Sequence, residues 1–135
     1  MTLFRPRLFT MFAVSICVLA AGLIGAQSSV AKTFGCPNPK ATAGLKGGYF
    51  TELRVTGYSS KSRGCRSGKR LVAAYDRCRR ERGGNKGSCN NKTVNGLKCK
   101  ERRPADLQSD TQINARVTCT KGSKKVRHTY QQNLS

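Results

Sequence analysis

The stretch that decides the fold is QINARVTCTKGSKKVRHTY, residues 112–130. Apolar side chains occupy alternate positions in each half, and Lys121-Gly122-Ser123-Lys124 between them is typical of a tight turn. A period of two places successive side chains on opposite faces of a sheet. The stretch therefore predicts a β-hairpin with strands over 112–120 and 125–130. The side chains expected on its inner face are Ile113, Ala115, Val117, Cys119, Val126, His128 and Tyr130.

Upstream of the hairpin, residues 65–82, CRSGKRLVAAYDRCRRER, have the periodicity of an amphipathic helix that ends at Gly83-Gly84. The apolar positions share one side: Leu71, Val72, Tyr75 and Cys78. Five basic side chains share the other: Arg66, Lys69, Arg70, Arg77 and Arg80. We call these five residues the helix stripe. It is either a docking surface for polyanions or a solvated helix face. Arg79, Arg80 and Arg82 are well placed near the negative end of the helix dipole.

Two further strands complete the predicted domain. Residues 49–58 alternate, with Leu53 and Val55 on one face, and residues 94–101 form a strand broken by Gly96. The outward positions of the first are Glu52, Arg54 and Thr56. The connecting segments are loop-like: an arm over 32–48, a polar turn over 59–64, a loop over 83–91 and a connection over 104–110. This order predicts an α+β domain with one helix packed on a small antiparallel sheet of about four strands.

The N-terminus has the features of a secretory signal peptide. Arg5 and Arg7 precede an apolar run over 11–26, and small residues follow it. Ser29-Val30-Ala31 predicts cleavage after Ala31, with Ala26 as the second choice. An uncleaved membrane anchor is the alternative. The predicted organisation is a signal peptide over 1–31, an arm over 32–48 and a domain over 49–135, in a protein that is secreted or associated with the cell envelope.

The cysteine count agrees with export. Of the 7 cysteines, Cys17 lies in the leader, and the six that follow are Cys36, Cys65, Cys78, Cys89, Cys99 and Cys119. An even number in a short exported chain predicts three disulfides in an oxidising compartment. Cys78 and Cys89 are close enough in sequence to form a helix-to-loop bridge. Zinc-binding spacing is absent and His128 is the sole histidine, so no metal or cofactor is expected.

Charge indicates the class of partner. Without the two arginines of the leader, the chain keeps 24 of its 26 basic residues against 6 acidic ones, a formal charge of +18. Such a chain attracts anionic polymers and anionic membrane surfaces, and self-repulsion makes disulfides valuable to it. We expect a monomer.

Several short motifs resemble a group of small secreted actinobacterial cysteine-containing proteins. Cys65 opens the helix, Val94-Asn95-Gly96-Leu97-Lys98-Cys99 forms the next strand, and Val117-Thr118-Cys119 leads into the hairpin. The resemblance covers about residues 50–130. Leu97 stands where the group's pattern has an aromatic residue, and the Cys36 arm lies outside the shared region. The resemblance implies export and this architecture, and it implies no activity.

No complete catalytic motif is present, so the sequence favours a secreted, cationic, non-catalytic binding or structural protein with anionic partners. One alternative is an exported cationic antimicrobial or toxin-like protein. Another is a small secreted ribonuclease, because barnase-like microbial ribonucleases place a helix before an antiparallel sheet and use a carboxylate, an arginine and a histidine. Here those residues would be Glu101, Arg116 and His128.

Overall fold

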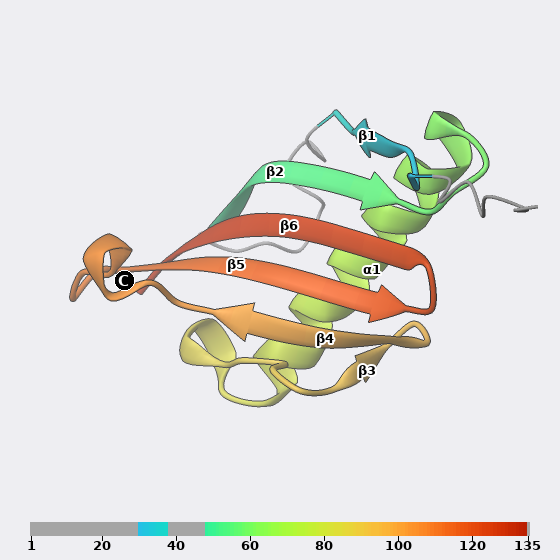
Figure 1. The fold of residues 1–135 in the computed structure, drawn as a ribbon. Coiled ribbons are helices and arrows are strands. Elements are labelled where there is room, and N and C mark those ends of the chain that lie inside the picture. Colours follow the sequence, from blue (N-terminus) through green and yellow to red (C-terminus); the bar gives the residue numbers. More distant parts are fainter. Residues whose placement is uncertain (1–29, 38–47, 135) are drawn as a thin grey trace, which may run out of the picture.

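The two halves of the decisive stretch form the central hairpin of an antiparallel sheet, β5 (Gln112–Lys121) and β6 (Lys124–Asn133) (Figure 1). The computed structural model describes residues 30–37 and 48–134. All seven predicted inner-face residues of this hairpin are buried, which confirms the alternation. Strand β6 continues beyond the predicted end at Tyr130, and Gln132 is completely buried on the same face.

Strand β2 (Gly48–Thr56) lies beside β6, as the alternation of residues 49–58 predicted. Its pairing with β6 shifts register between Phe50 and Glu52, so Thr51 is the extra residue of a bulge. The short strand β1 (Thr33–Gly35) pairs with the outer edge of β2. The arm predicted to be loop-like over 32–48 therefore contains one strand, which at three residues is too short to display a period. Residues 38–47 of the arm lie outside the described residues.

The predicted strand over 94–101 is in fact a small hairpin. Strands β3 (Thr93–Val94) and β4 (Leu97–Arg102) are joined by Asn95 and Gly96, at φ 46° and 78°. An Asn-Gly pair in the left-handed region is the favoured two-residue hairpin turn. With β1 and β3 as short edge strands, the sheet has six strands rather than about four, in the order β1-β2-β6-β5-β4-β3.

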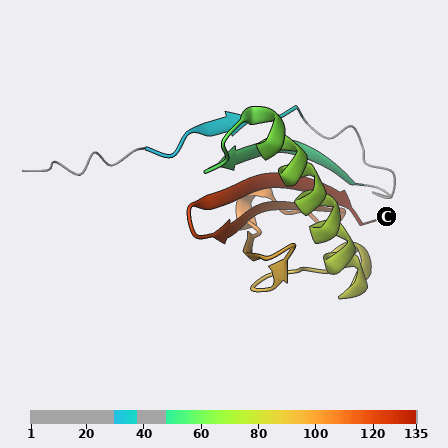
Figure 2. The same ribbon diagram turned by 90° about the vertical axis from the view of Figure 1, so that its right-hand side faces the viewer.

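Helix α1 (Lys61–Glu81) packs diagonally across one face of this sheet (Figure 2). It begins four residues before the predicted start at Cys65, because the Ser60 side chain accepts a hydrogen bond from the Arg63 amide and caps it. The polar turn expected over 59–64 is thus largely helical. Gly68 allows the close approach to β2, since a Cβ there would lie 2.9 Å from Val55 Cγ1. Two 3₁₀ turns, η1 (Gly84–Lys86) and η2 (Ala105–Leu107), lie in the predicted loops.

Three disulfides join the six predicted cysteines. Cys36–Cys65 ties the arm to α1, Cys78–Cys89 ties the end of α1 to the following loop, and Cys99–Cys119 joins β4 to β5. The predicted Cys78–Cys89 pairing is confirmed. Three disulfides in so small a domain fit an oxidising, extracellular environment. Within residues 30–37 and 48–134, no helix has the length and apolar character needed to span a membrane. Residues 1–29 of the predicted leader lie outside the described residues.

Candidate binding groove on the open sheet face

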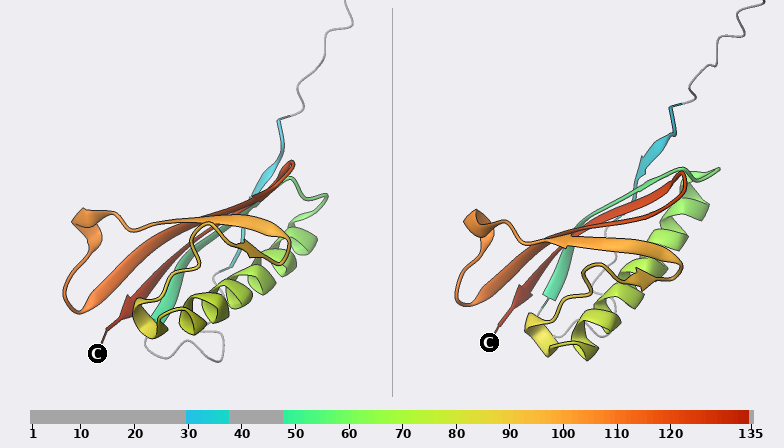
Figure 3. Two further views of the ribbon diagram at one scale, coloured as in Figure 1. Left: turned by 90° about the horizontal axis from the view of Figure 1, so that it is seen from below. Right: turned by 60° about the horizontal axis from the view of Figure 1, so that its bottom comes forward.

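Helix α1 covers one face of the sheet and leaves the other facing solvent (Figure 3). We call the solvent-facing side the open face. Alternation along the four long strands sends Leu53, Val117 and His128 toward α1 and sends their neighbours to the open face. The open face is therefore built from the outward positions of β2, β4, β5 and β6.

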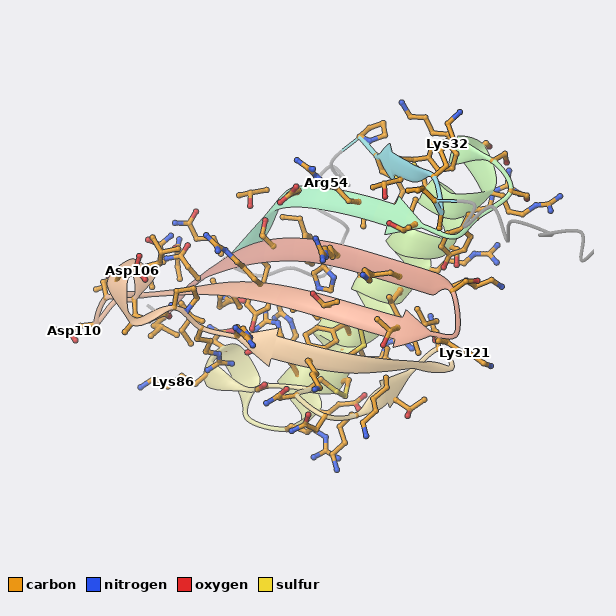
Figure 4. The ribbon with its side chains drawn as sticks, in the orientation of Figure 1. Lys32, Arg54, Lys86, Asp106, Asp110 and Lys121 are labelled. Carbon is orange, nitrogen blue, oxygen red and sulfur yellow. A yellow bond between two sulfur atoms is a disulfide. The ribbon has the colours of Figure 1, made fainter. Side chains whose placement is uncertain are left out.

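Cations dominate these outward positions. Figure 4 labels Arg54 on β2, with α1 behind the sheet in that view. The register of the four strands brings seven basic side chains onto the open face: Arg54, Lys98, Lys100, Arg102, Arg116, Lys125 and Arg127. Six of them are exposed and Lys125 is half-buried. This is a larger group of cations than the helix stripe, assembled from residues far apart in the sequence.

Five of these cations line a groove of about 1130 Å³ that runs over the open face. They are Arg54, Lys100, Arg102, Arg116 and Arg127. Pro104 and Leu107, from the segment that contains η2, also line the groove. Pockets for small molecules have volumes of roughly 300–1,000 Å³ and are mostly apolar. This groove is larger and strongly charged, so it suits an extended anionic chain better than a compact ligand.

Within the groove, the sheet register places like charges directly opposite one another. Arg54 is the cross-strand partner of Arg127, and Arg102 is the partner of Arg116. Such partners have Cβ atoms roughly 5 Å apart, and like charges at that spacing destabilise a sheet. In the described part of the chain, Arg102, Arg116 and Arg127 form no ion pair. An anion bound between these guanidinium groups would remove the repulsion.

Glu52 is the one acidic residue that lines the groove within the described residues. Its carboxylate forms an ion pair with Arg54 and keeps 42% of its side-chain surface exposed. Its cross-strand partner on β6 is Thr129, whose hydroxyl hydrogen-bonds the hydroxyl of the bulge residue Thr51. The groove therefore carries one carboxylate among its cations, together with the hydroxyls of Thr51, Thr118 and Thr129.

Among the described residues that line the groove, no aromatic side chain is exposed. The ring-bearing residues among those that line the groove are His128 and Tyr130, and they are only 1% and 4% exposed because they point toward α1. Proteins that bind single-stranded nucleic acid through its bases usually present exposed aromatic rings. The groove of this protein can instead contact the charged backbone of a polymer.

The helix stripe lies on the outer side of α1, away from the sheet. Arg66, Lys69, Arg70 and Arg77 are exposed, whereas Arg80 is half-buried and its Nε lies 2.9 Å from Asp76 Oδ2. The two basic surfaces thus lie on opposite sides of the two-layer domain.

Arg79 lies in the last turn of α1, as predicted, but its side chain is buried. It is 1% exposed and donates hydrogen bonds to Asp76 and Gln132. Its guanidinium lies 4.7 Å from the centre of the Tyr130 ring. This burial was not predictable, because Arg79 lies in a segment rich in basic residues, with Arg77, Arg80 and Arg82 close by.

Two of the three candidate ribonuclease residues are buried beneath α1. Glu101 accepts hydrogen bonds from the Tyr75 hydroxyl and from Arg103 Nε, the latter at 2.6 Å, and is 9% exposed. His128 is 1% exposed and packs edge-on against Phe50 and Tyr75. Arg116 is on the open face, so the fold separates it from the other two.

Burial also sets the protonation states of this interior cluster. It lowers the pKa of His128 to about 3, so the imidazole is neutral at physiological pH. Neither ring nitrogen of His128 has a hydrogen-bond partner among the described residues. Burial, and then the hydrogen bond to Glu101, raise the pKa of the Tyr75 hydroxyl. Burial and the Glu101 charge raise the pKa of Tyr130 to about 12. The rings of His128, Tyr75 and Tyr130 all lie in the interior between helix and sheet.

The described residues contain no group of three His, Cys, Asp or Glu side chains placed to hold a metal ion. Comparison with known proteins found no matching family model, curated protein or solved structure. The chemistry of the two basic surfaces is therefore the feature of this protein that indicates a function.

Proposed function

We propose that this protein is an exported binding protein that holds a phosphodiester polymer in the groove on the open face of its sheet. The observation that carries the proposal is the pairing of arginines directly opposite one another, Arg54 with Arg127 and Arg102 with Arg116, at a site with a single carboxylate. Repulsion between these arginines costs folding stability, and a bound anion offsets that cost.

The kind of cation favours phosphate as the bound group. Four of the five basic residues that line the groove are arginines. The planar guanidinium donates two parallel hydrogen bonds to phosphate or carboxylate oxygens, and it gives up its hydration more readily than an ammonium group. The guanidinium groups extend from four adjacent strands, so successive charges of one polymer can each meet a cation.

The groove is a better candidate than the helix stripe for a second reason. Arg80 of the stripe is already paired with Asp76, and the remaining stripe residues lie on a convex helix surface. A polymer on a convex surface stays hydrated on most sides, whereas a groove surrounds more of it and strengthens each charge interaction. We therefore assign the helix stripe a general contribution to electrostatic attraction.

Two matched double variants test the proposal. Arg116→Ala/Arg127→Ala removes two groove cations, and Arg66→Ala/Arg77→Ala removes two stripe cations with the same change in net charge. Binding of a fluorescent oligonucleotide is measured by anisotropy over a range of salt concentrations. We expect the groove variant to lose affinity and to reduce the slope of log K against log salt by about 1.4, the value for two lost contacts with a single strand. The stripe variant should change that slope by much less.

Equal losses of oligonucleotide affinity in the two double variants would show that only net charge matters. That result would refute the groove as the binding site. Heparin and poly-glutamate serve as sulfate and carboxylate polymers in the same assay. Tighter binding of either than of the oligonucleotide would contradict the assignment to phosphodiesters. Release of dye from anionic vesicles would instead support the antimicrobial alternative.

A further inference from the structure

The carboxylate of Glu52 needs an explanation in a groove built for anions. It faces the same solvent as the cations around it and is 42% exposed, so a polymer in the groove reaches it. A carboxylate near bound phosphates repels them, which lowers affinity for any polyanion. Besides its ion pair with Arg54, the carboxylate offers a ligand only an acceptor, so a ligand that carries a hydrogen-bond donor close to its phosphates gains a contact there.

The surroundings of Glu52 specify where that donor must lie. Along β2, Arg54 lies two residues away on the same face and pairs with the carboxylate. Across the sheet, Thr129 is opposite Glu52, and Arg116 is opposite Thr129 on the next strand. Arg127 lies diagonally from Glu52, at a spacing of about 7–8 Å typical of such neighbours. A phosphate held between Arg116 and Arg127 would therefore lie within one sugar unit of the carboxylate.

The Thr51 and Thr129 hydroxyls extend this polar site. They form a hydrogen bond with each other on the open face, and the bulge in β2 is what turns Thr51 to the same side as Glu52. Each hydroxyl both donates and accepts, so the pair can contact a sugar hydroxyl and a phosphate oxygen. A carboxylate, two hydroxyls and flanking guanidinium groups together match a phosphodiester that has a hydroxyl on the neighbouring sugar carbon.

From this arrangement we propose that the groove selects RNA over DNA, with Glu52 accepting a hydrogen bond from the ribose 2′-hydroxyl while Arg116 and Arg127 bind the adjacent phosphate. The 2′-hydroxyl is the group by which proteins distinguish the two polymers at a given site. The absence of exposed rings among the described lining residues agrees with recognition of the backbone rather than the bases. This inference rests on the proposed function, because it requires a phosphodiester in the groove.

The expected discrimination is moderate. A ligand without the 2′-hydroxyl leaves the carboxylate facing a phosphate with no hydrogen bond from the sugar. Losing a hydrogen bond to a charged group in this way lowers affinity by about tenfold or more. Partial exposure of Glu52 keeps the effect at the lower end, so uridine oligomers should bind about tenfold more tightly than deoxyuridine oligomers of the same length.

The test compares these two oligomers on the full mature protein and on two variants. Glu52→Gln removes the groove carboxylate at nearly constant size. Glu81→Gln, at the exposed end of α1, gives the same change in net charge outside the groove. We expect Glu52→Gln to bind the deoxyribose oligomer more tightly and to reduce the preference for RNA to about threefold or less. Glu81→Gln should keep the original preference.

Three results separate the possible failures. If neither oligomer binds the unaltered protein, the proposed function itself is wrong. If both bind equally, the groove binds phosphodiesters and selection of RNA is refuted. If Glu52→Gln strengthens binding of the two oligomers to the same degree, the preference for RNA is unchanged. The carboxylate then acts only through its charge, and the role given to Glu52 is refuted.

Discussion

Acid should destabilise this protein through the buried imidazole of His128. An unfolded chain binds a proton at this histidine below a pH of about 6.5, whereas the native state binds it only below about 3. As the pH falls between these values, the unfolded state is the one that gains the proton, so the free energy of unfolding decreases. The decrease is about 1.4 kcal/mol per pH unit, or about 3 kcal/mol between roughly pH 6.5 and 4.5.

His128→Leu isolates this contribution, because leucine has a similar volume and does not titrate. Denaturant titrations followed by circular dichroism, with disulfides intact, would give the free energy of unfolding of both proteins at each pH. The other titratable groups are common to both proteins, so their contributions cancel in the difference. Between roughly pH 6.5 and 4.5, the free energy of unfolding of the variant should fall by about 3 kcal/mol less than that of the unaltered protein. Parallel curves, or an imidazole NMR signal that titrates near pH 6.5, would show that His128 is solvated and that this reasoning is wrong.

Three other predictions concern the scaffold and the cost of the groove. Replacing Cys36 and Cys65 together by serine opens a loop with a sequence separation of 29 and should lower the free energy of unfolding by about 3–4 kcal/mol, as measured by denaturant titration. Gly87→Ala should lower the melting temperature strongly, since its Cβ would lie 1.8 Å from a backbone carbonyl oxygen of α1, whereas Gly35→Ala, with open space around it, should have little effect. Arg127→Thr should raise stability by up to about 1 kcal/mol while it weakens oligonucleotide binding, because it removes a like-charged cross-strand pair; a variant that loses stability and keeps binding would contradict this.

The sequence predicted those elements whose pattern extends over several periods. The hairpin over 112–130 and the strand over 49–58 each contain enough alternating positions to define a face. Strands β1 and β3 have three and two residues and therefore no measurable period, although Asn95-Gly96 did carry a hairpin signal. The start of α1 was misplaced because the capping role of Ser60 depends on local geometry that composition alone does not reveal.

The groove was not predictable in the same way. Each of its cations, such as Arg54, Lys100 or Arg116, is an ordinary outward residue of its own strand. Only the register between strands, which the sequence does not contain, makes them neighbours. The helix stripe was visible because its residues are brought together by the helix period within one segment. A local group of charges is therefore visible in the sequence, whereas the larger group assembled from four strands is not.

The position of the Cys99–Cys119 disulfide connects the scaffold to the groove. These cysteines are direct cross-strand partners on the side of β4 and β5 that faces α1, while Arg102 and Arg116 form a like-charged pair between the same two strands on the open face. Repulsion on one side of the strand pair is thus opposed by a covalent link on the other. A sheet of similar size held by hydrogen bonds alone could relieve such repulsion by separating at this pair, and a disulfide prevents that. The covalent framework therefore lets the sheet keep closely spaced arginines free for an anion, which connects the oxidising environment of this protein to its proposed binding function.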